Sequence, residues 1–228
     1  YSQCFLKIRC NDIFMSSLNV KRKRGRPVAS EKLDTTVLLE AALVVFSDHG
    51  YEGAQLKEVA SMVGVTTPLI SYHFENKEDL WKQSIIHLSA KIMLRYEEVQ
   101  KEHSDLSGIA LLKAFTRQYL HLMAKFPSMY KILLQEMGRK SWRYDFVSQH
   151  LLMPVVWFSH KPITESKDLE EFKAIPVANF VSIMFGATSS FFVLAQTLEA
   201  EYGISPFTDE NIEMHANIMN DLIFKQFE

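Results

Sequence analysis

Two short apolar patterns with helical spacing, joined by one glycine, constrain this 228-residue chain more than any other feature. The first runs from Leu56 to Val63 and places its apolar residues three and four positions apart, as on one face of a helix. Gly64 ends it, because glycine adopts the left-handed backbone conformation at little cost. Thr66 is then a natural N-cap, and Pro68 suits the first turn of a second helix, which we expect to reach about Phe74. The pattern therefore predicts a helix-turn-helix.

Further helices flank this unit on both sides. A pattern that starts at Asp34 keeps its apolar residues on one face and stops at Gly50. After the unit, Asn76 caps another helix, with Asp79 at the capping-box position, and an apolar stripe continues to about residue 102. The stripe of the first helix is Leu38, Ala41, Ala42, Val45 and Phe46, and that of the last is Trp81, Ile85, Leu88, Ile92 and Tyr96.

The rest of the chain is also helical in its spacing. Segments rich in Phe, Met, Leu and Tyr span residues 108–126, 128–140, 142–160, 176–201 and 209–227. Pro154 should kink or divide the helix that contains it. The chain is 47% hydrophobic and has only eight Gly and seven Pro. We therefore predict an all-α fold with a sizeable core.

The second helix of the motif has an unusual composition, since residues 64–74 read GVTTPLISYHF and contain no acid, Lys or Arg. An ordinary surface helix shows charged residues to water. Hydroxyl groups instead bond phosphates and base edges, and a leucine can touch a thymine methyl group in the major groove. A buried helical hairpin has the same spacing and is the alternative. The residues expected to face DNA are Thr66, Thr67, Leu69, Tyr72 and His73.

Charge is distributed unevenly along a chain whose net charge is only −2. Residues 1–30 hold seven Lys or Arg and one acid, whereas residues 31–80 hold three Lys or Arg and nine acids. The excess lies in the run KRKRGRP at residues 21–27, which we call the basic arm. Such a run is either a solvated tail or a nucleic-acid-binding segment, and its occurrence with a helix-turn-helix favours the second. Its cations are Lys21, Arg22, Lys23, Arg24 and Arg26.

Three segments of the N-terminal region resemble the TetR (tetracycline-repressor-like) family of bacterial transcriptional regulators. They are LEAALVVFSDHGY at residues 39–51, LKEVASMVGV at 56–65 and ISYHFENKEDL at 70–80. The resemblance is specific over residues 34–82, and beyond them it covers only length and helical character. It implies an N-terminal three-helix DNA-binding domain at 34–82 and a C-terminal helical ligand-binding and dimerisation domain at 83–228. Residues 1–33 are then an N-terminal extension that we expect to be disordered, and the protein is expected to be cytoplasmic.

The resemblance also implies contacts with the DNA backbone. Family members usually begin their fourth helix with a Lys that touches a phosphate, and Lys77 matches it. They usually begin their second helix with a Ser or Thr that also meets the DNA, whereas this chain has Gln55, which forms a weaker capping box with Glu58. The small basic residue often found near position 67 is absent, so the DNA half-site does not follow from family members.

The 176–201 helix is apolar on every side and must be buried on both sides. One side can pack on its own domain and the other on a second copy, which with the last helix predicts a homodimer built on an intersubunit four-helix bundle. A bilayer span is the alternative, because residues 174–198 carry no charge. Seven Asn, Ser, Thr or Gln within them favour the homodimer, and we expect no membrane insertion. The interface candidates are Phe191, Leu194, Leu198, Ile218 and Leu222.

A surplus of methionine and aromatic residues in the C-terminal part favours an adaptable pocket for a small-molecule effector. Each such residue taken alone is more often plain core. The ligand is expected to be apolar or amphipathic. The candidate lining is Phe115, Tyr119, Met123, Met137, Trp142, Phe146, Trp157, Phe180 and Met184, and the candidate polar anchors are Gln118, Tyr119 and Asn179.

No motif suggests a reaction. The eight His show no i,i+4 pairing, Cys4 and Cys10 lack partners at zinc spacing, and neither a nucleophile motif nor a phosphate loop occurs. We predict no catalytic residue, no metal and no cofactor. The expected function is a transcriptional repressor that a small ligand releases from palindromic operator DNA. The alternative is a helical protein-interaction or small-molecule-binding module with a vestigial helix-turn-helix. Because the chain begins without Met, we expect Met15 to be its natural start.

Deletion of residues 1–27 should weaken the salt dependence of DNA binding. The region 31–80 is acidic, so the basic arm must neutralise phosphates, and its Arg24-Gly25-Arg26-Pro27 segment resembles an AT-hook core suited to a narrow A·T minor groove. If about half of the arm charges of a dimer meet phosphates, at about −0.9 per contact, the slope of log affinity against log salt should flatten by roughly four to five units. Sequence preference should survive. An unchanged slope in a binding titration would show that the arm is only a tail.

Overall fold

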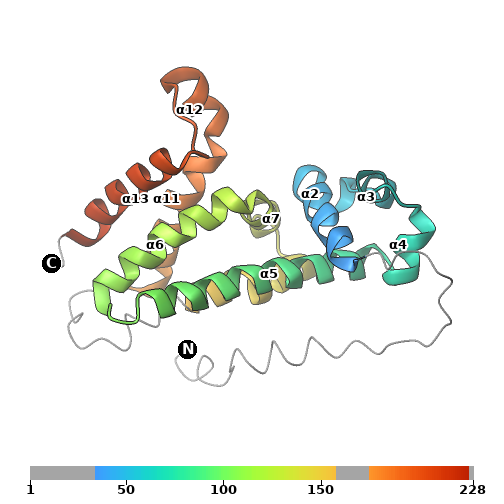
Figure 1. Ribbon diagram of the computed structural model, residues 1–228, viewed down its shortest axis with the longest axis horizontal. Helices are drawn as coiled ribbons and strands as arrows, with labels where there is room; N and C mark the ends of the chain where they lie inside the picture. The colour runs from blue at the N-terminus through green and yellow to red at the C-terminus, as the bar shows by residue number, and fades with distance from the viewer. Residues whose placement is uncertain (1–33, 158–174, 226–228) are drawn as a thin grey trace. The chain divides into compact units, whose positions relative to one another are not determined.

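The computed structural model describes residues 34–157 and 175–225, and all regular secondary structure within them is helical (Figure 1). The predicted all-α fold is confirmed. The first described helix, α2 (Thr35–Gly53), buries its predicted apolar stripe and packs against α3 (Leu56–Val63), α5 (Lys77–Glu102) and α7 (Pro127–Met137). Its regular part ends at Gly50, whose φ of 69° lies in the left-handed region. The predicted stop at Gly50 is therefore confirmed, although one further turn follows the kink.

The helix-turn-helix forms where the sequence predicts it, with α3 (Leu56–Val63) and α4 (Thr67–His73) on either side of Gly64. Gly64 has a φ of 75°, which permits the tight turn. Ile70 is buried and anchors α4 on the core. Thr66 occupies the N-cap position with an extended backbone, but its side chain makes no capping hydrogen bond. The Thr66 hydroxyl is therefore not consumed by the end of its own helix.

The next helix, α5 (Lys77–Glu102), begins beside the helix-turn-helix and continues well past it (Figure 1). Reciprocal hydrogen bonds fix its start. The Asn76 side chain accepts from the Asp79 N–H at 2.9 Å, and the Asp79 carboxylate accepts from the Glu75 N–H at 3.0 Å. The predicted cap is confirmed. The five residues of the predicted α5 stripe are all buried and carry the packing of α5 against α2 and against the C-terminal helices.

Three helices follow α5. They are α6 (Gly108–Lys125), α7 (Pro127–Met137) and α8 (Trp142–Val147). α7 packs against both α2 and α8, so it lies between the helix-turn-helix region and the C-terminal helices. α6 packs against α5 on one side and against later helices on the other.

The segment predicted as one helix at 142–160 contains a wide turn. After α8 the chain forms a π-helical turn, η2 (Ser148–Leu152), and then remains helical to Trp157. The Met153 N–H donates to the first carbonyl of η2, five residues earlier. Pro154 has no N–H and its ring presses on the preceding turn, so a wider turn just before it relieves the clash. The sequence predicted a kink or a division of this helix at Pro154, and the structure has a π-helical turn just before the proline.

The prediction of one continuous helix at 176–201 is wrong. The chain forms α11 (Val177–Val193) and α12 (Ala195–Tyr202), which are bent by 59° at Leu194. Hydroxyl groups also bond the backbone of α11 before the bend, since Thr188 and Ser189 each donate to the carbonyl four residues earlier, at 2.7 Å and 2.5 Å. Such bonds compete with the backbone ladder and bend helices.

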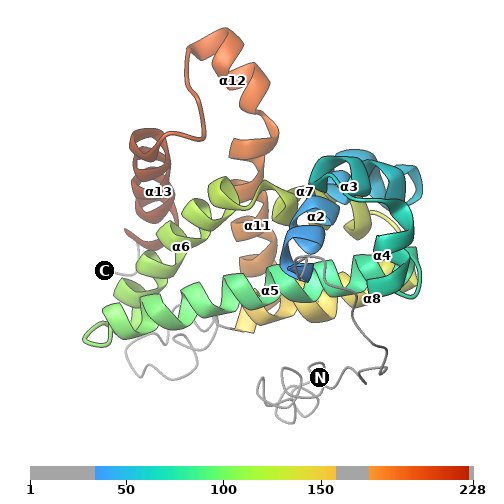
Figure 2. The same cartoon turned by 45° about the vertical axis from the view of Figure 1, so that its right-hand side comes forward.

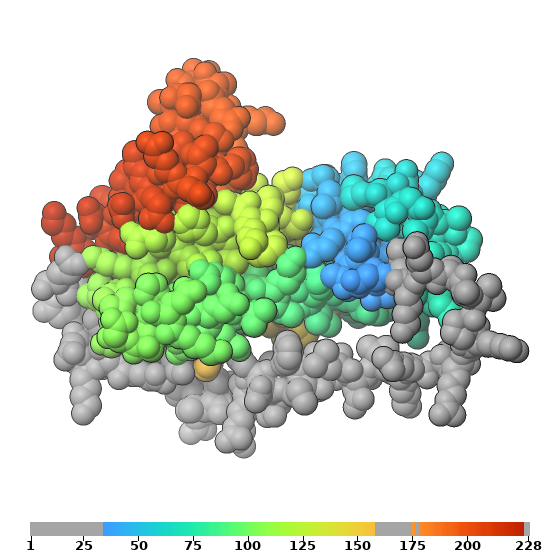
Figure 3. Space-filling model, viewed as in Figure 1, coloured from blue at the N-terminus to red at the C-terminus, as the bar shows by residue number. Residues whose placement is uncertain are grey.

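The last helix, α13 (Asp209–Phe224), lies beside α11, while α12 projects beyond both (Figures 2 and 3). α12 buries none of its residues. Within residues 34–157 and 175–225, no single helix has the length and apolarity to cross a membrane, and only the bent α11–α12 pair meets that test jointly.

Candidate DNA-binding surface, apolar cavity and subunit interface

α4 presents an uncharged surface. Tyr72 is 75% exposed, Thr66 is exposed at the start of the helix, and Thr67, Leu69 and His73 are half-buried. The Tyr72 and His73 rings lie edge to face with their centres 5.2 Å apart. Hydroxyl, phenol and imidazole groups therefore lie together on one short helix, and these are groups that bond phosphates and base edges.

Two further exposed polar residues lie on α3 and α4, although the sequence pattern did not single them out. Ser71 is exposed on α4, and its Oγ donates to the carbonyl of Thr67 at 3.4 Å. Lys57 is exposed on α3 and has no ion-pair partner in the described part of the chain. Gln55 is exposed just before it, and the Glu58 carboxylate accepts the Gln55 N–H at 3.4 Å. The one available signal for Lys57 was its position as a lone cation in an acidic region.

Lys77 lies at the start of α5, where its ammonium group is engaged within the chain. Its Nζ donates to the carbonyl of Glu52 at 3.1 Å and lies 5.1 Å from the centre of the Tyr51 ring. A cation in this place stabilises the C-terminal end of α2, where carbonyl groups lack helical partners. Because an ammonium group has three donors, this geometry is compatible with a phosphate contact as well.

The unit of α2, α3 and α4 is a helix-turn-helix domain of the kind that binds DNA. The first cations of the adjoining α5 are engaged, since Lys77 is bonded to Glu52 and Lys82 pairs with Glu78 at 2.5 Å. The basic arm, with Lys21, Arg22, Lys23, Arg24 and Arg26, lies outside the described residues.

A small apolar cavity of about 60 Å³ lies between α6, α11 and the helical turn that follows η2. Four of the predicted ligand residues line it, namely Phe115, Tyr119, Phe180 and Met184. Burial raises the pKa of the Tyr119 hydroxyl, so this group stays protonated and can donate a hydrogen bond. The remaining lining residues are Leu112, Thr116, Leu152, Val155, Val156, Val181 and Phe185. These are ordinary core residues, and no sequence signal distinguished them.

The other predicted ligand residues lie elsewhere. Met123 is buried in the core, and Met137, Trp157 and Asn179 are exposed. Trp142 and Phe146 pack on Trp81, with ring centres 5.4 Å and 5.7 Å from it. Gln118 lines a different concavity, between α5 and α6. The C-terminal aromatic residues thus divide between the cavity and the helix-turn-helix region.

The concavity between α5 and α6 is an open groove of about 730 Å³. Charged side chains line it, but its charges are largely paired. Arg95 bonds Glu102 at 2.8 Å, and Lys91 bonds Glu40 at 2.5 Å. Although burial raises the pKa of Glu40, its bonds to Lys91 and His87 hold that pKa below the ordinary value. A groove neutralised in this way offers little net attraction to an anion.

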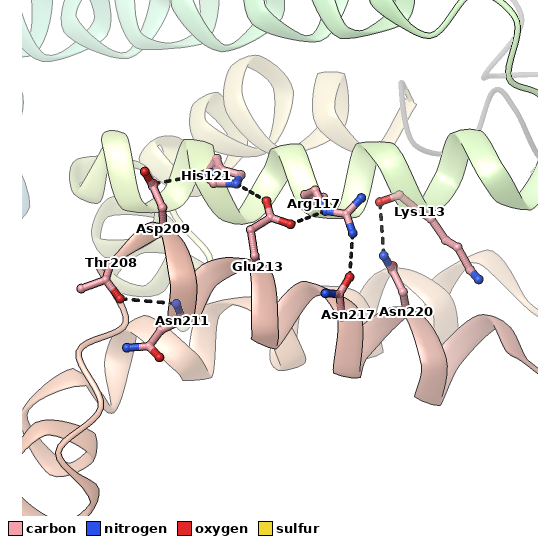
Figure 4. Close-up of polar contacts among 9 residues, drawn as sticks. All are labelled: Lys113, Arg117, His121, Thr208, Asp209, Asn211, Glu213, Asn217 and Asn220. Atoms are coloured by element: carbon pink, nitrogen blue, oxygen red, sulfur yellow. Dashed lines mark hydrogen bonds and ion pairs between the residues drawn. The ribbon is translucent and has the colours of Figure 1, made fainter.

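A row of polar contacts fixes α13 on α6 (Figure 4). The Nε of Arg117 donates to Glu213 at 2.7 Å, and its Nη2 donates to Asn217 Oδ1 at 2.7 Å. The Nε2 of His121 lies 2.7 Å from the second carboxylate oxygen of Glu213. Burial raises the pKa of Glu213, but His121 and Arg117 together hold it below the ordinary value. These directional bonds set the rotation of α13 about its own axis.

With that rotation, α13 leaves a separate apolar face exposed. Met214, Ile218 and Leu222 follow one another at intervals of four residues and form one stripe, in which Leu222 is 78% exposed. Leu194, at the bend between α11 and α12, is also exposed, while Leu198 is half-buried. An exposed apolar stripe of this kind is typical of a protein–protein contact surface.

Phe191 has a different role within the chain. Its ring stacks on His215 with the centres 4.1 Å apart and the planes 5° apart. The His215 Nε2 donates to the carbonyl of Ala187 at 3.2 Å. Burial lowers the pKa of His215, and the bond to Ala187 opposes this only in part. Phe191 therefore contributes to the packing of α11 on α13 inside one subunit, and it does so against a neutral imidazole.

Comparisons with known proteins find relatives of the helix-turn-helix region. Residues 38–83 match the family model described as bacterial regulatory proteins, tetR family. The HTH-type transcriptional regulator RutR of Escherichia coli K12 is 28% identical over 115 residues, which are 50% of this chain and 51% of RutR. The chain thus spans about half the length of the curated relatives it matches. The helix-turn-helix region of this chain thus matches the TetR family of bacterial regulatory proteins, and the relative that it resembles is a transcriptional regulator.

Solved structures match over more of the chain. FadR from Bacillus subtilis, in complex with stearoyl-CoA, has a TM-score of 0.64 at 17% identity and covers 83% of this chain and 97% of its own. A putative fatty acid metabolism regulator from Clostridium perfringens has a TM-score of 0.65 at 18% identity, with the same coverage. At such low identity these likenesses concern the fold, and they extend it from the DNA-binding domain to the C-terminal helices.

The buried imidazoles predict a loss of stability in mild acid. Burial lowers the pKa values of both His215 and His150 in the folded chain. As the pH falls below the unfolded value of about 6.5, the unfolded chain takes up protons that the folded chain does not, so the folded state loses stability. Carboxylates with lowered pKa values, such as Glu213, act only at lower pH. Between pH 7 and pH 5 the change should therefore come from these histidines.

The variant His215→Phe tests this expectation, because phenylalanine keeps a ring against Phe191 and cannot titrate. The free energy of unfolding, measured by denaturant titration at pH 7, 6 and 5, should fall less steeply with decreasing pH than in the wild type. If both proteins lose stability equally, His215 is not a source of the acid sensitivity.

Proposed function

We propose that this protein is a sequence-specific DNA-binding regulator of transcription that inserts α4 into the major groove. The observation that carries the proposal is the exposed, uncharged face of α4 in a domain that matches a family of regulators. On this proposal Thr66 and Tyr72 reach base edges, and Leu69 contacts a thymine methyl group. Lys57 and Lys77 bond phosphates. Residues 34–82 form the DNA-binding domain, and the later helices serve ligand binding and dimerisation.

The proposed DNA-binding species is a homodimer. Support comes from the exposed stripe of Met214, Ile218 and Leu222 on α13 and from the exposed Leu194 at the end of α11. A two-fold axis through α11 and α13 would bury this face against itself in a four-helix bundle. Two recognition helices then read a palindrome, with centres about 34–36 Å or somewhat more apart.

The proposed regulation is release from DNA by an apolar or amphipathic ligand, so that the protein acts as a repressor. Support comes from the apolar cavity that Phe115, Tyr119, Phe180 and Met184 line, and from the stearoyl-CoA bound to the fold neighbour FadR. At about 60 Å³ the cavity has room for only a few atoms of a ligand. A larger ligand must displace the walls, and this displacement is what can favour a conformation that binds DNA poorly.

Substitution of Leu222 by Asp should give a monomer and abolish tight operator binding. A charge on the most exposed position of the stripe cannot be buried against a second copy. Loss of the second half-site contact should weaken binding to a selected palindrome by roughly a hundredfold or more. Light scattering gives the mass, and fluorescence anisotropy gives the affinity.

The matched control is Leu94→Asp, which places the same charge at an exposed leucine of α5, away from α11 and α13. It should stay dimeric and bind the palindrome as the wild type does. A wild-type monomer at micromolar concentration would refute the dimer. A wild-type protein that selects no sequence from random duplex DNA would refute the proposed function as a whole.

Stearoyl-CoA and free stearic acid are the first effectors to test. If one of them fills the cavity and moves its walls, operator affinity should fall roughly 5–150-fold, which is the typical range of allosteric coupling. Calorimetry measures ligand binding, and anisotropy with labelled operator measures release. A ligand that binds at the cavity but leaves operator affinity unchanged would contradict ligand-controlled release while leaving DNA binding intact.

A further inference from the structure

An aromatic cluster joins the helix-turn-helix domain to α8. Tyr51, at the C-terminal end of α2, meets Trp81 of α5 and Trp142 of α8 edge to face, with ring centres 5.8 Å and 5.5 Å away. Trp81 and Trp142 are themselves 5.4 Å apart. Three rings from three helices therefore pack against one another, and a movement of α8 changes the surroundings of both DNA-binding-domain rings.

Arg143 fastens this cluster with directed bonds. Its Nε donates to both oxygens of Glu136 on α7, at 3.1 Å and 3.0 Å, and its Nη1 donates to Glu52 on α2 at 3.0 Å. The guanidinium carbon lies 4.9 Å from the centre of the Tyr51 ring. The side chains of Arg143 and Glu136 are only 17% and 6% exposed. A guanidinium fork held in this way fixes orientation as well as distance.

The same stretch of chain reaches the apolar cavity at its other end. From Trp142 to Trp157 the backbone is helical throughout, as α8, η2 and a final turn. Leu152, the last residue of η2, lines the cavity together with Val155 and Val156 of the final turn. The segment 142–157, which we call the α8–η2 rod, therefore contacts the DNA-binding domain at its start and the cavity at its end.

The π-helical turn lies between the contacts of Trp142 and Arg143 and those of Val155 and Val156. A π-helical turn holds one more residue than an α-helical turn, and such turns are often found at functional sites. Conversion of η2 to α-helical register would rotate the residues after it by about 100° relative to those before it, since an α-helix has 3.6 residues per turn. The π-helical turn is therefore the place in the rod where a change of register by one residue would alter how its two ends are related, and an element with two such arrangements can couple distant sites.

We propose that the α8–η2 rod transmits cavity occupancy to the DNA-binding helices, and that Arg143 is the positioning residue that fastens the rod to α2. This inference rests on the proposed ligand-controlled function. Pressure on Leu152 and Val155 moves the rod, and the bonds of Arg143 carry that movement to Glu52 and Tyr51 at the end of α2. Without Arg143 the cavity end of the rod can move while the DNA-binding domain does not follow.

The test uses a substitution on α11, outside the rod, that fills the cavity with a larger side chain. Val181 of α11 lines the cavity together with the rod residues, so Val181→Phe fills the cavity without altering the sequence of the rod. Hydrogen exchange of the full-length protein, without DNA or ligand, should change about fivefold or more for amides of residues 51–80 relative to the wild type, at the lower limit of typical coupling. In the double variant Val181→Phe with Arg143→Gln, this change should disappear while the change within η2 remains.

Matched controls separate transmission from general loosening. Arg139→Gln removes an exposed arginine that has no ion pair in the described part of the chain, and it should leave the effect of Val181→Phe intact. Val181→Ala enlarges the cavity and should not reproduce the effect. If Val181→Phe fails to fold, Thr116→Leu fills the same cavity from α6. A merely structural role for Arg143 would raise exchange in the single variant without cancelling the effect of the filled cavity.

Two results would overturn the proposal. In the first, Val181→Phe alters hydrogen exchange in η2 but not in residues 51–80. In the second, the effects of Val181→Phe and Arg143→Gln on hydrogen exchange in residues 51–80 are additive. Neither outcome depends on DNA, so each is distinct from a failure of the proposed function, which would appear as a lack of sequence-selective binding by the wild type.

Discussion

Burial of one stripe along α5 is the interaction on which the rest of the structure depends. Five side chains from Trp81 to Tyr96 are each at most 1% exposed, and full burial of a large aliphatic side chain contributes about 1.5–3 kcal/mol. α3 and α4 have only eight and seven residues, which is too short for a helix to be stable alone. They persist because α3 packs on α2, which α5 holds in turn, and α4 packs on α3. The position of α4 is therefore a property of α5 and of whatever packs on it, including the α8–η2 rod.

The cations near α4 mainly serve this architecture. Lys77 bonds the end of α2, Lys82 pairs with Glu78, and Arg143 joins α7, α8 and α2. On the proposed function, attraction to DNA must come from cations without such partners. Lys57 is one of these in the described part of the chain, and the basic arm lies outside it. The helix-turn-helix domain then positions α4 for recognition, while the basic arm supplies most of the charge that neutralises phosphates. An acidic domain can therefore still bind DNA.

Local signals in the sequence were sufficient for the helix-turn-helix. Gly64 makes the turn through its own backbone conformation, and Asn76 caps α5 by bonding the backbone of a near neighbour. The turn and the cap therefore follow from residue type. The bend at Leu194 was not predictable from apolar periodicity, because apolar residues continue on both sides of it without a Pro or Gly at the break. The cavity was predicted only in part, since its walls come from three helices whose crossing no local pattern specifies. Trp142 has the composition of a ligand-binding residue, yet its position on α8 places it against Tyr51.

The size of the cavity links ligand length to response. A space of about 60 Å³ accepts a small apolar group without movement, and a ligand with equal affinity for both conformations shifts nothing however tightly it binds. A long acyl chain cannot enter unless the walls separate, which breaks contacts such as those among Leu112, Phe180 and Phe224. That cost is offset by the ligand's own buried apolar surface, at about 25 cal/mol per Å². On the proposed mechanism, only a ligand long enough to offset the opening of the walls can also move the rod, so the chain length of the ligand, more than its affinity, decides whether DNA is released.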